Sequence, residues 1–257
     1  VTVPSIGSRE LVVRFRQKFM KEAQTIAGLD NNHHIVRVTD VFEENETAYY
    51  VMEYAGNGSL ADKVKQQGQL SESVAKRYIL QVANALAYIH SQKMNHLDVK
   101  PANIMLSEAD NAVLIDFGMS KQYDAATGNQ TSTTPVGISE GYAPMEQYKQ
   151  GGVGEFSPET DIYSLGATFF KLLTGITPPS ASDVNEDGVP VAELKAKGVS
   201  KSCIDTICKA MEVRKKDRIK SIDSFVRLLG NTSVPIPSVL NPVSESNDEE
   251  ATIVNVQ

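Results

Sequence analysis

Apolar positions at helical spacing mark the first predicted element. Between residues 9 and 29 they alternate with charged side chains, the apolar set being Val13, Phe15, Phe19, Ile26 and Leu29. Two stretches rich in Val, Ile and Tyr, 34–43 and 47–54, predict strands joined by the polar turn EENE. Gly56 and Gly58 then interrupt the pattern. We therefore expect a helix, a pair of strands and a flexible connection.

From residue 59 onward the periodicity is mostly helical. A long amphipathic helix is predicted over 71–92, with Ser71 as its N-cap. A second is predicted over 157–175, with Pro158 in its first turn and Gly175 just past its last turn. The shorter predicted elements are the β-like pieces NIML and AVLID, which follow the first of these helices, and helices over 200–213 and 221–229.

Two segments lack periodicity. Residues 117–142 are rich in Gly, Ser and Thr and predict a long loop, a feature typical of functional or disordered segments. Residues 231–257 are rich in Pro, Ser and Asn and then acidic, which predicts a disordered tail. We therefore expect an α+β chain with a small, partly β lobe over 1–55 and a larger helical lobe over 56–230. A cleft between two such lobes is a natural ligand site.

Composition narrows the class of protein. The chain has 257 residues, of which 41% are hydrophobic and 22% charged, so a sizeable core is expected. A formal net charge of −7 disfavours nucleic acid or an anionic membrane as a general partner. Cys203 and Cys208 would diverge on one helix, and two thiols without a disulfide fit a reducing cytoplasm. We expect no membrane-spanning segment and see no secretory signal.

The segment HLDVKPANI, residues 96–104, places Asp98, Lys100 and Asn103 within six residues. Asp116 follows the apolar piece AVLI, where a buried carboxylate is costly unless a cation holds it. Carboxylate and amide oxygens without a His or Cys cluster suit Mg²⁺ rather than zinc. Phosphoryl transfer fits this inventory. Asp98 would take the proton of the acceptor hydroxyl, and Lys100 would neutralise the γ-phosphate. Asn103 and Asp116 would hold Mg²⁺.

Three motifs occur in a fixed order along the chain. They are His-x-Asp-x-Lys-Pro-x-Asn at 96–103, Asp-Phe-Gly at 116–118 and Ala-Pro-x-Glu at 143–146. In order and spacing they resemble the protein kinases, and the bacterial eukaryotic-like Ser/Thr kinases in particular. The resemblance covers residues 9–230. It implies a two-lobed kinase fold, ATP and Mg²⁺ as cofactors, and transfer of phosphate to Ser or Thr of a protein substrate in cytoplasmic signalling.

The resemblance also implies nucleotide-binding residues. The segment YYVMEYAGNGSL resembles the connection between kinase lobes. Met52 would be the gatekeeper, the Glu53 carbonyl and Ala55 amide would contact adenine, and Met105 would lie under its ring. Glu22 matches the glutamate of the small-lobe helix. A Glu on a charged helix face is usually just solvated, but the alignment of its neighbours favours the functional role.

Four other matches imply structural roles. Asp161 in DIYSLG would hold the backbone of the 96–103 motif, and Arg218 would pair with Glu146. Ser139 would bridge the catalytic carboxylate and Lys100, and both residues favour Ser/Thr over Tyr specificity. His96 is interpreted as a packed histidine rather than an acid or base.

Three features bear on phosphorylation of the chain itself. Leu97 stands where most kinases have an Arg that pairs with a phosphorylated loop residue. We infer that loop phosphorylation is not needed to order the site and that Leu97 packs against apolar neighbours. Residues 131–134 (TSTT) are interpreted as solvated hydroxyls in preference to autophosphorylation sites. Thr252 is a candidate site for a phosphothreonine-binding partner, although a linker without a specific role is favoured.

The start of the chain departs from the family. The residues before Glu22 contain neither a glycine-rich phosphate loop nor a strand lysine, and Lys18 and Lys21 share the predicted helix with Glu22. We expect an N-terminally truncated active kinase, because the large-lobe motifs are retained. The alternative is a pseudokinase or nucleotide-sensing scaffold. A small-molecule kinase of the aminoglycoside phosphotransferase type is disfavoured by Lys100 and by the motif at 143–146.

Overall fold

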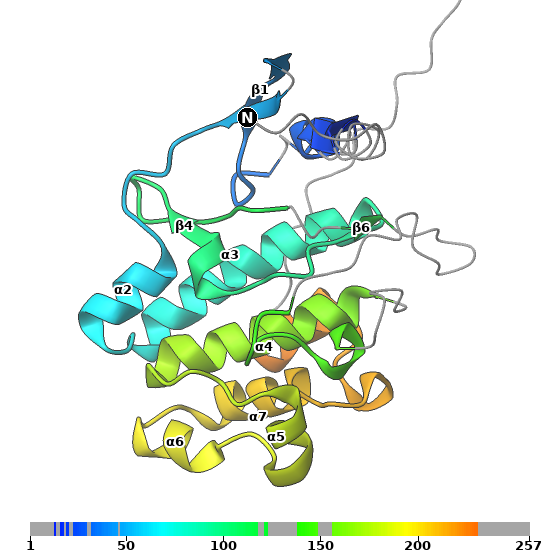
Figure 1. Ribbon diagram of the computed structural model, residues 1–257. Coiled ribbons are helices and arrows are strands. Elements are labelled where there is room, and N and C mark those ends of the chain that lie inside the picture. The colour runs from blue at the N-terminus through cyan, green and yellow to red at the C-terminus, as the bar shows by residue number, and fades with distance from the viewer. Residues whose placement is uncertain are drawn as a thin grey trace, which may run out of the picture.

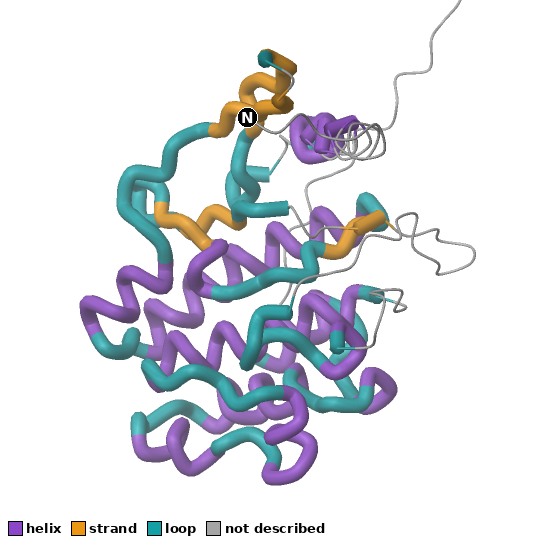
Figure 2. The backbone as a smooth tube through the Cα atoms, viewed as in Figure 1, coloured by secondary structure: helices purple, strands orange, loops and turns teal. Residues whose placement is uncertain are grey.

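The computed structural model describes residues 13, 16–17, 19–20, 23–29, 32–45, 47–117, 121–122, 138–148 and 156–230. A small strand-bearing part lies above a larger helical part (Figures 1 and 2). Glu22, residues 131–134 and the tail with Thr252 lie outside the described residues, so the predictions made for them stay predictions.

The small lobe pairs helical residues with a two-stranded antiparallel sheet. Residues 23–27 are helical, and β1 (Val38–Glu44) pairs with β2 (Thr47–Met52) through a turn with positive φ at Asn45. The rings of Phe19 and Tyr50 lie 5.3 Å apart between their centroids, which packs the helical segment against β2. Both predicted strands are present.

The first predicted strand begins later than expected, because residues 34–36 pair elsewhere. The amide of Leu114 donates to the carbonyl of His34 at 2.8 Å, and the amide of Val36 donates to the carbonyl of Leu114 at 3.0 Å. Leu114 belongs to β5 (Ala112–Leu114), which pairs antiparallel with β4 (Ile104–Leu106). This backbone pairing joins the small lobe to the large one.

Backbone contacts also pin the predicted flexible connection. The amide of Leu106 donates to the carbonyl of Gly58 at 2.8 Å, and the amide of Asn57 donates to the carbonyl of Leu106 at 3.2 Å. Ser59 then caps α2 (Leu60–Gln67) by accepting from the amide of Asp62, whose carboxylate accepts from the Ser59 amide. The segment is therefore anchored to β4 at residues 57–59.

The large lobe is built on two long helices that the sequence predicted, α3 (Glu72–Ser91) and α4 (Pro158–Thr174). Ser71 holds the N-cap position of α3 with extended backbone, but its side chain makes no capping hydrogen bond. Around them lie α5 (Ala181–Asp187), α6 (Val191–Ala196), α7 (Lys201–Ala210) and α8 (Ile222–Leu228), as Figure 1 shows. Helices α7 and α8 were predicted with longer bounds.

Two glycines let α4 pack closely. A Cβ on Gly166 would lie 2.6 Å from the Cβ of Ala210, so the absence of a side chain permits the contact between α4 and α7. Gly175 ends α4 with a φ of 74°, and a Cβ there would lie 1.9 Å from the carbonyl oxygen of Gly68. Helix α4 is consequently buried along most of its length.

The remaining elements are short. Strand β3 (Met94–Asn95) pairs with β6 (Lys121–Gln122), so the segment predicted as a loop contains a strand. The 3-10 turns are Pro101–Asn103, Met145–Gln147 and Lys215–Asp217. Both cysteines are free thiols, as predicted. None of the helices within the described ranges is long and apolar enough to cross a membrane.

Candidate active site

A buried carboxylate on α4 fixes the backbone that leads into the 96–104 segment. Asp161 is fully buried and accepts from the amide of His96 at 2.9 Å and from the amide of Leu97 at 2.8 Å. His90 Nε2 lies 2.8 Å from the same carboxylate. Buried charge is tolerated when several donors satisfy it. The role predicted for Asp161 is confirmed.

His96 links this segment to the strand that precedes Asp116. Burial lowers the pKa of His96, so the imidazole is neutral near pH 7. Its Nε2 lies 3.0 Å from the carbonyl of Ile115, and the amide of Asp98 donates to its Nδ1 at 3.3 Å. These contacts assign the proton to Nε2. The ring packs edge-on against the ring of Phe117, with 4.7 Å between the two centroids. This contact confirms the interpretation of a packed histidine.

Three side chains converge on the carboxylate of Asp98, which is 6% exposed. Ser139 Oγ donates to Oδ1 at 2.5 Å, while Lys100 Nζ and Asn103 Nδ2 each donate to Oδ2 at 2.8 Å. Lys100 Nζ also donates to Ser139 Oγ at 2.9 Å. The predicted bridge by Ser139 is therefore confirmed, and the carboxylate lies within an ion pair with Lys100.

The β4–β5 hairpin brings Asn103 and Asp116 to one end of the site. Asn103 directly precedes β4, and its carbonyl accepts from the amide of Ile115, the neighbour of Asp116, at 3.0 Å. Asp116 itself has a φ of 62°. Carboxylate and amide oxygens suit Mg²⁺, which takes its other ligands from water and phosphate. Within the described ranges, no group of three or more His, Cys, Asp or Glu side chains is arranged to hold a metal, so an all-protein cage is absent there.

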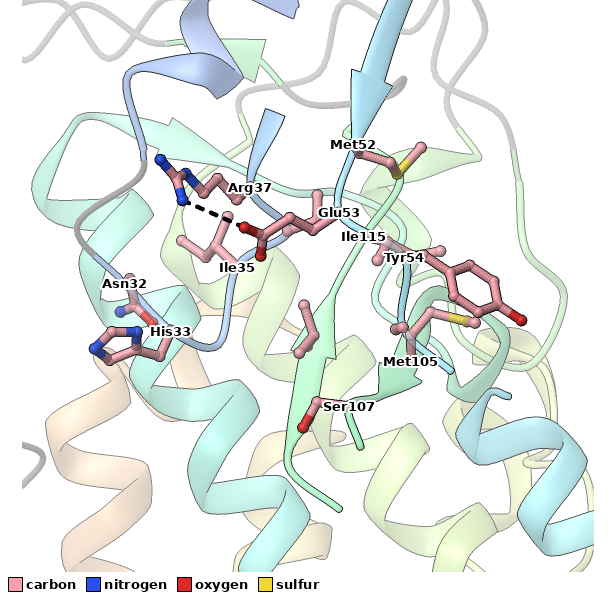
Figure 3. Close-up of a pocket in the computed structure, with 13 residues that line it drawn as sticks. Asn32, His33, Ile35, Arg37, Met52, Glu53, Tyr54, Met105, Ser107 and Ile115 are labelled. Carbon is pink, nitrogen blue, oxygen red and sulfur yellow. Dashed lines mark hydrogen bonds and ion pairs between the residues drawn. The ribbon is translucent and has the colours of Figure 1, made fainter. Parts of the chain in front are cut away.

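A pocket of about 640 Å³ lies between the small sheet and the β4–β5 hairpin (Figure 3). All four residues predicted to contact the nucleotide base, Met52, Glu53, Ala55 and Met105, line it. Sequence reasoning missed the other lining residues, which are Asn32, His33, Ile35, Val36, Arg37, Tyr54, Ser107, Val113 and Ile115.

The missed residues extend the pocket beyond the predicted nucleotide contacts. Figure 3 shows Asn32 and His33 at the end opposite Tyr54 and Met105. Arg37 lies between these ends, where its guanidinium is 3.3 Å from the Glu53 carboxylate. Ser107 lies two residues beyond Met105, so strand alternation was a signal that pointed to it, whereas Val113 pairs with Met105 across the hairpin and needed the register.

A buried ion pair anchors the segment that carries Ser139. Arg218 Nη1 lies 2.7 Å from Glu146 Oε1, and the two side chains are 0% and 10% exposed. The guanidinium also donates to the carbonyls of Glu159, Glu212 and Val213. The predicted pairing is confirmed.

A second anchor, missed in the sequence, holds the turn of the β4–β5 hairpin. Asp110 accepts from Lys63 at 2.8 Å, from Arg77 at 2.6 Å and from the Tyr78 hydroxyl at 2.7 Å. The hydrogen bond from Lys63 is the main cause that lowers the pKa of Asp110 well below its usual value. The cluster ties the hairpin to α2 and α3.

Comparison with known proteins identifies the family. The protein kinase domain family matches residues 5–227. Serine/threonine-protein kinase B of Synechocystis is 35% identical over 83% of this chain and 38% of its own length. A probable serine/threonine-protein kinase of Clostridium perfringens is 32% identical over 88% of this chain and 32% of its length.

A third relative is similar to the same extent. Probable serine/threonine-protein kinase PknB of Bifidobacterium longum is 30% identical over 92% of this chain and 36% of its length. The chain thus spans 32% to 38% of the length of these three curated relatives. The family resemblance and the α+β fold with a small strand-bearing lobe are both confirmed. The chain belongs to the protein kinase family, among relatives that are bacterial Ser/Thr kinases.

Proposed function

We propose that this chain is the catalytic domain of a bacterial Ser/Thr protein kinase, which transfers the γ-phosphoryl group of Mg·ATP to hydroxyls of a protein. The observation that carries the proposal is the network of Ser139, Lys100 and Asn103 around the buried carboxylate of Asp98. The retention of this network also disfavours the pseudokinase alternative.

Asp98 is the proposed base that orients the acceptor hydroxyl. A carboxylate offers about four lone-pair sites. Ser139 uses one on Oδ1, and Lys100 and Asn103 use two on Oδ2. The acceptor hydroxyl therefore donates to the remaining site on Oδ1, beside Ser139. A positioned base of this kind contributes roughly 10² to 10⁴ in rate.

Lys100 is the proposed cation for the transferring group. Its ammonium group is held by Asp98 and Ser139, and its side chain remains 28% exposed. It therefore lies beside the acceptor site while staying accessible to an incoming phosphate. A preorganised positive charge there stabilises charge that develops on the phosphoryl oxygens during transfer.

The nucleotide would occupy the pocket beside Met52, Glu53, Ala55 and Met105. Asn103 and Asp116 would hold Mg²⁺, which when bound neutralises charge on the phosphates. The hydrogen bonds from Asn103 Nδ2 to Asp98 keep the metal ligand and the base in fixed relation. Lobes over 1–55 and 56–230, the role of Glu22 and a cytoplasmic location stay part of the proposal. For the tail, a linker without a specific role stays favoured over a phosphothreonine-binding partner.

Transfer of labelled phosphate from Mg·ATP to a generic basic protein and to the chain itself tests the proposal. The chain, and any longer product of its gene, is compared with its Asp98→Asn variant, for which we expect a loss of at least about 100-fold. Asp205→Asn is the matched control, because that carboxylate lies on the surface of α7 and pairs only with Lys201 in the described contacts. Absence of transfer from every unmodified form would favour the pseudokinase or scaffold instead.

A further inference from the structure

Leu97, the residue directly before Asp98, is held in an unusual conformation. Its φ is 68°, in the left-handed region that large side chains rarely adopt. Its side chain is 2% exposed and forms an apolar cluster with Phe156, also 2% exposed, apart from the main core. A conformation of this kind persists only where the surroundings enforce it.

Contacts from three directions enforce the conformation of Leu97. Asp161 accepts from its amide at 2.8 Å, and Gln147 Nε2 donates to its carbonyl at 2.8 Å. Phe156 covers its side chain. Both peptide groups of Leu97 are therefore bound by side chains rather than by a helix or strand ladder, and the apolar contact completes the enclosure.

These contacts and those of the carboxylate come partly from the same segment. Ser139 and Gln147 both belong to residues 138–148, and Phe156 directly precedes the N-cap of α4. Ser139 binds the Asp98 carboxylate while Gln147 and Phe156 bind the residue before it. A rotation at Leu97 would turn Asp98 away from Ser139, because Leu97 and Asp98 share a peptide bond.

We propose that Phe156 is a positioning residue for Asp98, acting through Leu97. This inference rests on the proposed function, and it assigns a role to a residue that is not among the described residues lining the pocket. Because the contact is apolar, it holds the backbone before Asp98 without a phosphate group or an ion pair.

The test compares Phe156→Ala and Phe156→Leu with the unmodified chain in the transfer assay. We expect Phe156→Ala to lower kcat roughly ten- to hundredfold, because small displacements of a base are costly. KM for ATP should change less than about twofold, because the pocket is not altered. Phe156→Leu keeps an apolar contact and should restore kcat to within about threefold of the unmodified chain.

Phe225→Ala is the matched control. Phe225 is fully buried in α8 and belongs to the main core rather than to the Leu97 cluster. Phe225→Ala should lose as much stability as Phe156→Ala but should keep the kcat of the unmodified chain. Both variants are assayed below their unfolding transitions. Loss of kcat in both variants, or normal kcat in folded Phe156→Ala, would overturn the inference.

Hydrogen exchange gives a readout that does not need activity. Phe156→Ala should raise exchange in a peptide that covers residues 94–104, whereas Phe225→Ala should raise it around α8. If every unmodified form, including any longer product of the gene, shows no transfer, the proposed function fails, but unchanged exchange at 94–104 separately refutes the positioning role. If Phe156→Ala does not fold, a cycle of Leu97→Ala, Phe156→Leu and their double variant replaces it. Losses in kcat that simply multiply would mean that the two residues act independently.

Discussion

Replacing Arg218 by leucine removes a guanidinium that is fully buried beside Glu146. The carboxylate, which is 10% exposed, would lose its cation, and the carbonyls of Glu159, Glu212 and Val213 would lose a donor. Thr160 Oγ1, which donates to Glu146 at 3.1 Å, would remain as a neutral partner. The variant therefore leaves a buried charge with too few donors.

The expected loss is large relative to total stability. Breaking a buried pair by removing one partner costs about 3–5 kcal/mol. A domain of this size has a free energy of unfolding of roughly 5–15 kcal/mol. At about 2–4 °C per kcal/mol, the midpoint of thermal unfolding should fall by roughly 6–20 °C. The pair between Arg214 and Asp217, with side chains 73% and 37% exposed, should contribute below about 1 kcal/mol.

Urea unfolding followed by circular dichroism measures these values. Arg218→Leu is compared with Arg214→Leu, the exposed control, and with Glu146→Gln and the double variant Arg218→Leu/Glu146→Gln. The double variant should lose less than the sum of the singles by about 2 kcal/mol or more, because the stranded charge is gone. A loss below about 1 kcal/mol for Arg218→Leu, or strict additivity, would refute the reasoning.

Three further changes test other parts of the structure. Ser139→Ala should lower kcat about tenfold with an unchanged KM for ATP, because a hydrogen bond to a charged group contributes about 1.5–3 kcal/mol, whereas Ser139→Thr should retain activity. Asp110 has a lowered pKa in the folded state, so its contribution to stability is present above its unfolded pKa of about 3.9 and is lost as pH falls below it. The gap in unfolding free energy between the unmodified chain and Asp110→Asn should therefore shrink in acid urea titrations, and a constant gap would contradict this. Gly175→Ala should cost clearly more than Gly188→Ala in thermal unfolding, since both have a positive φ but only the former meets a carbonyl oxygen, that of Gly68; equal losses would show that the close approach is not limiting.

Local patterns in the sequence determined the elements that depend on near neighbours. Helices α3 and α4 were located from apolar spacing and from Pro158 and Gly175 at the ends of α4. The capping pair of Ser59 and Asp62 was a further local signal, which would have located α2. Motif spacing and the family resemblance were enough to predict the contacts of Asp161, Ser139 and Arg218, because in this family those residues keep a fixed order along the chain.

Tertiary structure alone decided the contacts between residues far apart in the chain. No periodic pattern in the sequence indicates three of these contacts. They are the pairing of residues 34–36 with β5, the anchoring of Asp110 by α2 and α3, and the contact of Phe156 with Leu97. The far end of the pocket, with His33, likewise depends on how two hairpins meet. Apolar burial is not directional, so a sequence indicates which side chains are buried but not which distant partner each one meets.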